Sequence, residues 1–164
     1  MTKNKIFLGG TRNGSTWRKD VIEAIAGKVD YFDPTVEEVT PKSLETEWYQ
    51  KEHECNIHLY VITADMVGVL DIAEAMDSVH NPRVKTHFHV DAEGFSDAQL
   101  KSLEAVVALI QFRGGVGGIH GDKKELATVL DNPDKTFWVP ERKKPLEGVC
   151  GFLGGYPNLF TLFS

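Results

Sequence analysis

Three carboxylates follow one apolar segment in the middle of the chain, at a spacing compatible with acid–base or nucleophilic chemistry. Asp65 comes two residues after the segment Asn56–Thr63, and Asp71 and Glu74 follow within the next helical stretch. Residues three apart on a helix are neighbours, so Asp71 and Glu74 project on nearly one side. Such a pair can divide the roles of nucleophile and proton donor between two carboxyl groups.

A strand, a turn and a helix must position these acids. β-Branched and aromatic residues in Asn56–Thr63 predict a buried strand. Asp65 is expected to cap the following helix, with Gly68 in its first turn. The buried stripe of that helix is expected to comprise Leu70, Ala73, Met76 and Val79. In an open α/β sheet, ligands bind beyond the carboxyl ends of the strands, where this turn would lie.

The N-terminal segment shows the same succession of strand, turn and helix. Lys5–Leu8 is apolar, and residues 9–16 are rich in glycine and hydroxyl side chains. Gly9 and Gly14 have the spacing of a phosphate-binding P-loop, but Ser15 stands where that motif needs lysine, so a P-loop is not expected. Two interpretations stay open: a tight connection, or a loop that brings its backbone to a ligand.

The next two elements continue the alternation. Val29–Phe32 predicts a second strand that Pro34 terminates, and residues 40–54 predict a helix. The expected buried face of this helix comprises Leu44, Trp48 and Cys55. Its polar side, which includes Glu47, is expected to be solvated, although one of its residues could reach the cleft.

The following pair of elements carries two histidines. Lys85–Val90 predicts a fourth strand, and residues 96–109 predict an amphipathic helix capped by Ser96. His87 and His89 share one face of the strand. No third ligand cluster supports a metal site, so we interpret them as ordinary strand residues.

The last part of the chain is less regular. Residues 114–121 are rich in glycine and are expected to be mobile or tightly turned. Residues 124–130 predict a short helix, and residues 136–139 predict a fifth strand. The aromatic residues of 149–164 are expected to pack on the domain itself or on a neighbouring subunit.

Size and charge restrict the class of protein. At 164 residues, one domain with a substantial core is the simplest expectation. The chain carries 18 basic and 24 acidic residues, a net charge of -6, which argues against a nucleic-acid partner. With no apolar signal segment and no stretch of transmembrane length, we expect a cytoplasmic protein without a membrane partner. Cys55 and Cys150 are then expected to be reduced thiols.

The alternation of strands and helices predicts the fold class. We expect an α/β fold: a doubly wound, flavodoxin-like sheet of five parallel strands, in one domain over residues 1–164, with strand order 2-1-3-4-5. The switch point then lies between the first and third strands. Residues 9–12 would face residues 65–74 across one crevice, with Asp33 at the same edge.

Several stretches resemble the nucleoside 2-deoxyribosyltransferase family, in particular its short deoxyribosyltransferase-like branch. These stretches are Lys5–Thr11, Asp30–Pro34, His58–Gly68, Ile72–Glu74 and Asp77–Ser78. They cover the first half of the chain strongly and the rest loosely. Their order and spacing carry the resemblance.

The resemblance implies a role for each acid. Glu74 would attack the anomeric carbon, expel the base and hold a covalent glycosyl-enzyme until a second base or water takes the sugar. An aspartate would assist protonation of the leaving base; Asp65 is the first candidate and Asp71 the second. A neighbouring carboxylate would raise the pKa of one partner, which favours proton donation.

The same resemblance implies the remainder of the site. The expected substrate-binding residues are Gly9, Gly10, Thr11, Arg12, Asp33, Pro34 and Gly68, with Gln99 supplied by an adjacent subunit of a homo-oligomer. No metal or organic cofactor is implied. The family's first strand often carries a tyrosine that hydrogen-bonds the nucleophile, where this chain has Phe7, and its small Gly-Thr or Gly-Ser pair is Leu70-Asp71 here.

Three functions are compatible with these residues. The first is transfer or cleavage at the N-glycosidic bond of a (deoxy)nucleoside. The second is a nucleotide or NAD-type N-glycosidase, which Arg12 beside the first helix would favour. The third is a nucleotide-binding or sensing module without chemistry, favoured by Phe7 and Leu70-Asp71 and opposed by Glu74. The simplest alternative is that Asp71, Glu74 and Asp77 form only the solvated side of a helix.

Overall fold

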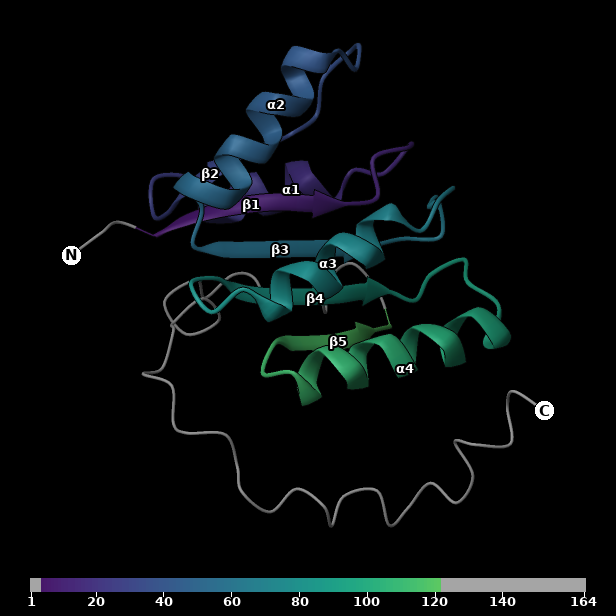
Figure 1. Cartoon of the computed structure of the whole chain (residues 1–164). Helices are drawn as coiled ribbons and strands as arrows, with labels where there is room; N and C mark the ends of the chain where they lie inside the picture. Colours follow the sequence, from purple (N-terminus) through teal and green to yellow (C-terminus); the bar gives the residue numbers. More distant parts are fainter. Residues whose placement is uncertain (1–3, 122–164) are drawn as a thin grey trace.

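Five parallel strands form the centre of the molecule (Figure 1). The computed structural model describes residues 4–121. The strands are β1 (Lys5–Gly10), β2 (Asp30–Phe32), β3 (Ile57–Ile62), β4 (Lys85–Asp91) and β5 (Val116–His120). Their order across the sheet is β2-β1-β3-β4-β5, and every neighbouring pair is parallel. This confirms the predicted α/β fold with flavodoxin-like strand order.

Helices cover both faces of the sheet (Figure 1). They are α1 (Trp17–Ile25), α2 (Pro41–Tyr49), which continues into the π-helical turn η1 (Gln50–Glu54), α3 (Leu70–His80) and α4 (Asp97–Phe112). α1 packs on one face, and α3 and α4 pack on the other. Within residues 4–121, no helix is both long and apolar enough to cross a membrane.

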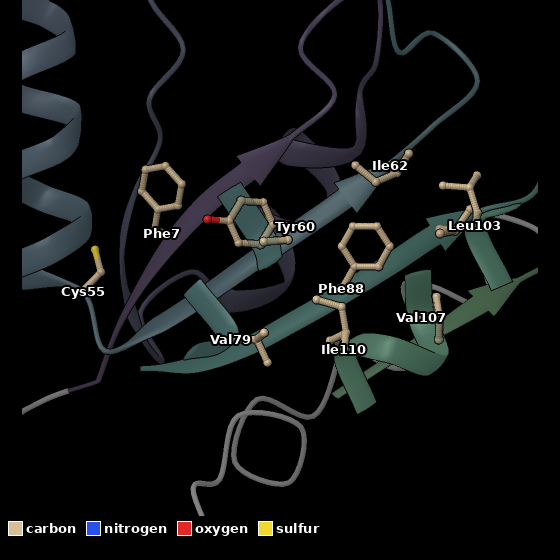
Figure 2. Packing of buried hydrophobic residues seen from close by; sticks show 11 residues of the cluster. Phe7, Cys55, Tyr60, Ile62, Val79, Phe88, Leu103, Val107 and Ile110 are labelled. Atoms are coloured by element: carbon tan, nitrogen blue, oxygen red, sulfur yellow. The ribbon is translucent and has the colours of Figure 1, made fainter. Parts of the chain in front are cut away.

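Alternate side chains of the central strands enter two separate hydrophobic clusters, because successive residues of a strand point to opposite faces. The cluster under α1 contains Ile6, Leu8, Ile57, Leu59 and Val61 of the sheet with Trp17, Val21 and Ile25 of the helix. In the other cluster, Phe7, Tyr60 and Phe88 point toward the side of α3 and α4 (Figure 2). Burial on both faces explains why β1 and β3 are continuous apolar runs rather than alternating ones.

The helix starts are specified locally in two cases. Ser96 Oγ accepts from Gln99 N at 3.4 Å, and Gln99 Oε1 accepts from Ser96 N at 3.0 Å. Thr40 and Ser43 make the same reciprocal capping box at the start of α2. Each box satisfies backbone N–H groups that have no partner inside the helix, and the predicted Ser96 cap is confirmed.

The predicted start of the helix after β3 is wrong. α3 begins at Leu70 with Val69 in the cap position, so neither Asp65 nor Gly68 belongs to it. Met66 N instead donates to Thr63 O at 3.0 Å, closing a separate turn before the helix. The buried residues of α3 are Ala75, Ser78 and Val79, with Leu70 69% exposed. Of the predicted stripe, Val79 is buried and Met76 is partly buried against the same cluster, whereas Leu70 and Ala73 are exposed.

The predicted buried face of the α2 helix is wrong in part: Cys55 is buried and Leu44 is half-buried, but Trp48 is not. Trp48 is 56% exposed, whereas Glu47 and Lys51 are buried. The two charged residues are four apart and therefore lie on one face, which meets charged partners on the β1–α1 turn and on α3. Buried charges are tolerated because each has an opposite charge beside it.

The fifth strand comes from a segment predicted to be mobile or tightly turned. Residues 116–120 pair with β4 in parallel, with Val90 opposite Ile119 and Asp91 opposite His120. Glycine suits this strand because a Cβ on Gly117 would collide with the carbonyl oxygen of Phe88. The predicted helix 124–130, the predicted strand 136–139 and the aromatic segment 149–164 lie outside the described residues.

Candidate active site at the carboxyl ends of β1 and β3

The switch point between β1 and β3 is joined to α3 by one hydrogen bond. Gly10 N, at the end of β1, donates to Asp71 Oδ1 at 3.2 Å. The bond holds the first turn of α3 against the carboxyl end of the sheet. Glu74 follows one turn later on the same side of the helix, so the predicted proximity of the Gly9–Arg12 turn and the acids of α3 is present.

Glu74 is paired with a buried cation. Lys51 Nζ lies 3.6 Å from Glu74 Oε1, and the two side chains are 6% and 18% exposed. The same ammonium lies 5.8 Å from the ring centroid of Phe7 and 6.0 Å from that of Tyr60, within the range of cation–π attraction. Glu74 is therefore a partly accessible carboxylate paired with a cation that itself lies over two aromatic rings.

A second ion pair lies beside the first. Arg12 Nη2 donates to Glu47 Oε1 at 2.8 Å, with the arginine side chain 36% exposed and the glutamate buried. Glu47 and Lys51 come from the same face of the α2–η1 segment. This segment thus supplies an anion to the β1–α1 turn and a cation to α3.

The pKa of Glu74 is raised above its ordinary value of 4.5. Burial is the main cause, because it disfavours the charged carboxylate. The ammonium of Lys51 opposes the rise, while the negative charges of Glu47 and Asp71 add to it. The predicted effect of a neighbouring carboxylate is thus present, but desolvation is the larger cause.

A buried polar network supports the Lys51 backbone. His58 Nε2 lies 2.9 Å from the carbonyl oxygen of Lys51, and His58 Nδ1 lies 2.9 Å from Ser78 Oγ. Ser78 Oγ is also 2.8 Å from the hydroxyl of Tyr60. Burial lowers the pKa of His58 to about 4, so at neutral pH it is an uncharged imidazole with one donor and one acceptor nitrogen. The network connects η1, β3 and α3 behind the ion pair.

The predicted substrate-binding residues of the β1–α1 turn are mostly structural. Thr11 Oγ1 accepts from Thr63 N at 3.0 Å and thereby joins the ends of β1 and β3. Gly9 is buried opposite Tyr60 in the β1–β3 register. Gly10 has φ +106°, and a Cβ there would collide with the backbone of Val61. These contacts favour the interpretation of a tight connection, and Arg12 is among the exposed polar residues of the turn.

Arg18, which sequence reasoning missed, fixes the end of β1. Its guanidinium donates to the carbonyl oxygens of Leu8, Gly10 and Thr11 at 3.1, 2.8 and 2.7 Å. Arg18 Nε also lies 3.5 Å from Asp33 Oδ1. Burial lowers the pKa of Arg18 to about 10, with the charge of Asp33 opposing the change. Asp33 therefore lies at the predicted edge, but its carboxylate is engaged with Arg18.

The contacts of the remaining predicted residues are with groups other than Glu74. Asp65 is exposed in the turn after β3, with its carboxyl carbon 3.9 Å from where a Cβ on Gly14 would stand. Gly68 is exposed before α3, and Pro34 is buried after β2. Gln99 is bound to Ser96 in the α4 cap. Its contribution to a neighbouring subunit stays a prediction.

The two strand histidines lie on β4, next to the edge strand β5. His87 and His89 are both buried in β4, and His89 Nδ1 lies 2.9 Å from His120 Nε2 on β5. Burial lowers the pKa of His89 to about 3. Across residues 4–121, no group of three or more histidine, cysteine, aspartate or glutamate side chains is arranged to hold a metal ion.

The comparisons with known proteins do not assign a family. No protein-family model matches the chain, and no curated protein matches it. The function therefore has to be argued from the geometry at Glu74.

The most informative residue of the site, Lys51, had no signal of its own in the sequence. A lysine four residues after a glutamate on a helix is ordinarily a solvated surface pair. The expected buried face of the helix over residues 40–54 (Leu44, Trp48 and Cys55) assigned its charged residues to the solvated side. Only the tertiary arrangement shows that Glu47 and Lys51 face Arg12 and Glu74.

Proposed function

We propose that this protein cleaves or transfers at the N-glycosidic bond of a nucleoside, with Glu74 as the nucleophile. The observation that carries the proposal is the partly exposed Glu74 carboxylate, paired with buried Lys51 at 3.6 Å beside the switch point of the sheet. Switch points are where open α/β sheets bind ligands. A solvated surface acid would have neither a buried cation nor a raised pKa.

The proposed reaction proceeds in two displacements. A carboxylate oxygen of Glu74 forms a bond to the anomeric carbon as the C–N bond to the base breaks, and the electron pair leaves with the base nitrogen. A proton donor neutralises that nitrogen. Water or a second base then attacks the anomeric carbon, the bond to Glu74 breaks, and the free carboxylate is restored.

Asp71 and Asp65 are the proposed proton donors. Asp71 is the better placed of the two, because it lies on nearly the same side of α3 as Glu74 and its Oδ1 is held by the Gly10 amide. We therefore place Asp71 before Asp65, the reverse of the order that the sequence favoured. Asp65 lies beside the β1–α1 turn, where a substrate group bound to that turn would meet it.

Arg12 favours a second candidate within the same chemistry, an N-glycosidase acting on a nucleotide or an NAD-type compound. Its guanidinium is partly exposed at the β1–α1 turn and contacts Glu47 through Nη2. Arginine binds phosphate through several parallel N–H donors, so a 5'-phosphate could share this group with Glu47. The choice between nucleoside and nucleotide follows from the substrate that is turned over.

We propose that the protein assembles as a homo-oligomer in the cytoplasm. Three neighbouring apolar side chains are largely exposed: Val67 and Val69 before α3, and Leu70 at its first position. Adjacent exposed apolar side chains are typical of protein–protein contacts. Light scattering of the full chain and of Leu70→Glu tests this, since charge at the contact should reduce the measured mass.

The test of function is chromatographic detection of base release and base exchange. Deoxynucleosides, their 5'-monophosphates and NAD are each incubated with wild type, Glu74→Ala and Asp77→Asn, the last being an exposed carboxylate on the same helix. We expect turnover by wild type and Asp77→Asn, and its loss in Glu74→Ala. Exchange between bases supports the transferase, and release from a 5'-phosphate or NAD supports the N-glycosidase. Tight binding without any turnover would replace both with a non-catalytic binding module.

A further inference from the structure

Lys51 is a buried lysine whose position depends on an irregular turn. At the end of α2 the helix widens into η1, where Cys55 N donates to Gln50 O at 2.9 Å, a bond that spans five residues. Such π-helical turns are rare and frequently occur at functional sites. The turn brings Lys51 toward the sheet, where its ammonium lies over Phe7 and Tyr60 and reaches Glu74.

Burial of this lysine needs an explanation. Lysine is almost never fully buried unless it is paired, because the ammonium loses its hydration. Here the side chain is 6% exposed and its carboxylate partner is Glu74. Phe7 offers no hydrogen-bond donor to that carboxylate, whereas the ammonium offers three. An apolar side chain in its place would leave the Glu74 carboxylate without an opposite charge.

We propose that Lys51 is the positioning residue of Glu74: its ammonium holds Oε1, orients the carboxylate toward the substrate and keeps it in the charged, nucleophilic form. The assignment rests on the proposed function, in which Glu74 attacks carbon. Since Lys51 binds Oε1, attack falls to Oε2. The carbonyl oxygen of Lys51 lies 2.9 Å from His58 Nε2, a contact that helps to fix the backbone from which the ammonium extends.

The charges around Glu74 define what loss of Lys51 should do. Glu47 on α2 and Asp71 on α3 both raise the pKa of Glu74, as does burial, and Lys51 lowers it. Tyr60 faces the pair from β3, and burial raises the pKa of its hydroxyl, so it stays neutral. His58 is uncharged near neutral pH. Removing the ammonium leaves burial and the two acids unopposed, and the pKa of Glu74 must rise further.

Two readouts on three variants test the assignment. Lys51→Met removes the charge at nearly constant length, and Lys51→Arg keeps it. Lys19→Met is the control, because the Lys19 side chain on α1 is 78% exposed. The first readout is the pKa of Glu74 from its carboxyl ¹³C resonance. The second is the pH profile of kcat/KM for base release.

We expect Lys51→Met to raise the pKa of Glu74 and to move the acidic limb of the profile to higher pH. We also expect kcat to fall by roughly 100-fold, the scale of a misplaced reacting group. KM should change little. Lys51→Arg should restore much of the rate, and Lys19→Met should match wild type.

An unchanged pKa of Glu74 in folded Lys51→Met would overturn the assignment, as would a profile that falls in height without shifting. If Lys51→Met does not fold, Lys51→Gln removes the charge while keeping a donor, and the same two outcomes apply. Should wild type be inert on every substrate, the proposed function fails. The ¹³C comparison then decides separately whether Lys51 controls the ionisation of Glu74.

Discussion

Asp71 Oδ1 accepts a hydrogen bond from Gly10 N at 3.2 Å, which joins α3 to the end of β1 across the switch point of the sheet. Gly10 and Asp71 are far apart in the chain, yet this contact sets the distance between the β1–α1 turn and Glu74. Asp71, the second candidate for the proton donor in the sequence, therefore also stabilises the packing of α3 against β1.

Asparagine and alanine at position 71 should separate these two roles. Asp71→Asn keeps the accepting oxygen, so its free energy of unfolding should stay near that of wild type. Asp71→Ala loses the bond and should be less stable by about 1 kcal/mol. Both variants should release base slowly, because neither can donate the proton. Urea unfolding and the base-release assay measure the two effects; full activity in Asp71→Asn would remove Asp71 as the donor.

Glu74→Gln should become more stable relative to wild type as the pH rises. Burial raises the pKa of Glu74 above 4.5, so the folded state binds this proton more tightly than the unfolded state does. The contribution of Glu74 to stability is then most favourable below pH 4.5 and is lost as the pH rises through the folded pKa. Urea unfolding from pH 4 to 8 measures the difference between the two proteins. If the stability of Glu74→Gln relative to wild type stays flat or falls with rising pH, the raised pKa is contradicted.

His58 should make the fold sensitive to acid. Its pKa falls from 6.5 to about 4 on burial, so the folded state resists protonation. This contribution is fully present above pH 6.5 and is lost as the pH falls toward 4, by up to about 3 kcal/mol at 1.36 kcal/mol per pKa unit. His58→Gln cannot titrate, and its free energy of unfolding should depend less on pH in this window. Parallel curves for the two proteins would show that His58 does not titrate on unfolding.

Gly27, which follows α1, is a matched control for a substitution of Gly10 at the end of β1. Both have positive φ, +106° and +73°, but a Cβ on Gly10 meets the Val61 backbone, whereas one on Gly27 meets nothing within 4 Å. Gly10→Ala should cost about 3 kcal/mol or more from strain plus collision, and Gly27→Ala about 1 kcal/mol from strain alone. Urea unfolding measures both; equal losses would mean that the close approach to β3 carries no energy.

The strand order was predictable because each strand and helix has a local signal in the sequence, and the alternation of these elements limits how they can be arranged. β1 and β3 are apolar runs of strand length, and amphipathic helices such as Asp97–Phe112 stand between strands. A chain that alternates in this way has few right-handed arrangements open to it. β5 was missed because its glycines lack strand propensity, and they are tolerated only through their close contact with β4.

The site was predictable in part. Glu74 and Asp71 follow from their spacing and from the edge at which their helix begins. Lys51 and Glu47 do not, because a buried ion pair looks like a surface pair until its distant partners are known. Asp65 was misplaced as a helix cap because its side chain suits that position, while the chain forms a separate turn first. Local propensity cannot weigh such tertiary contacts.

The most direct test of the account is to trap the glycosyl-enzyme. A 2-fluoro-substituted deoxynucleoside slows both displacements, and a good leaving base lets the first one proceed, so the covalent intermediate accumulates. Mass spectrometry of the intact protein should show one added fluorosugar, and peptide mapping should place it on Glu74. Wild type should gain this mass, and Glu74→Gln should not. A sugar on any other residue, or release of base without a covalent adduct, would contradict the role of Glu74 as nucleophile.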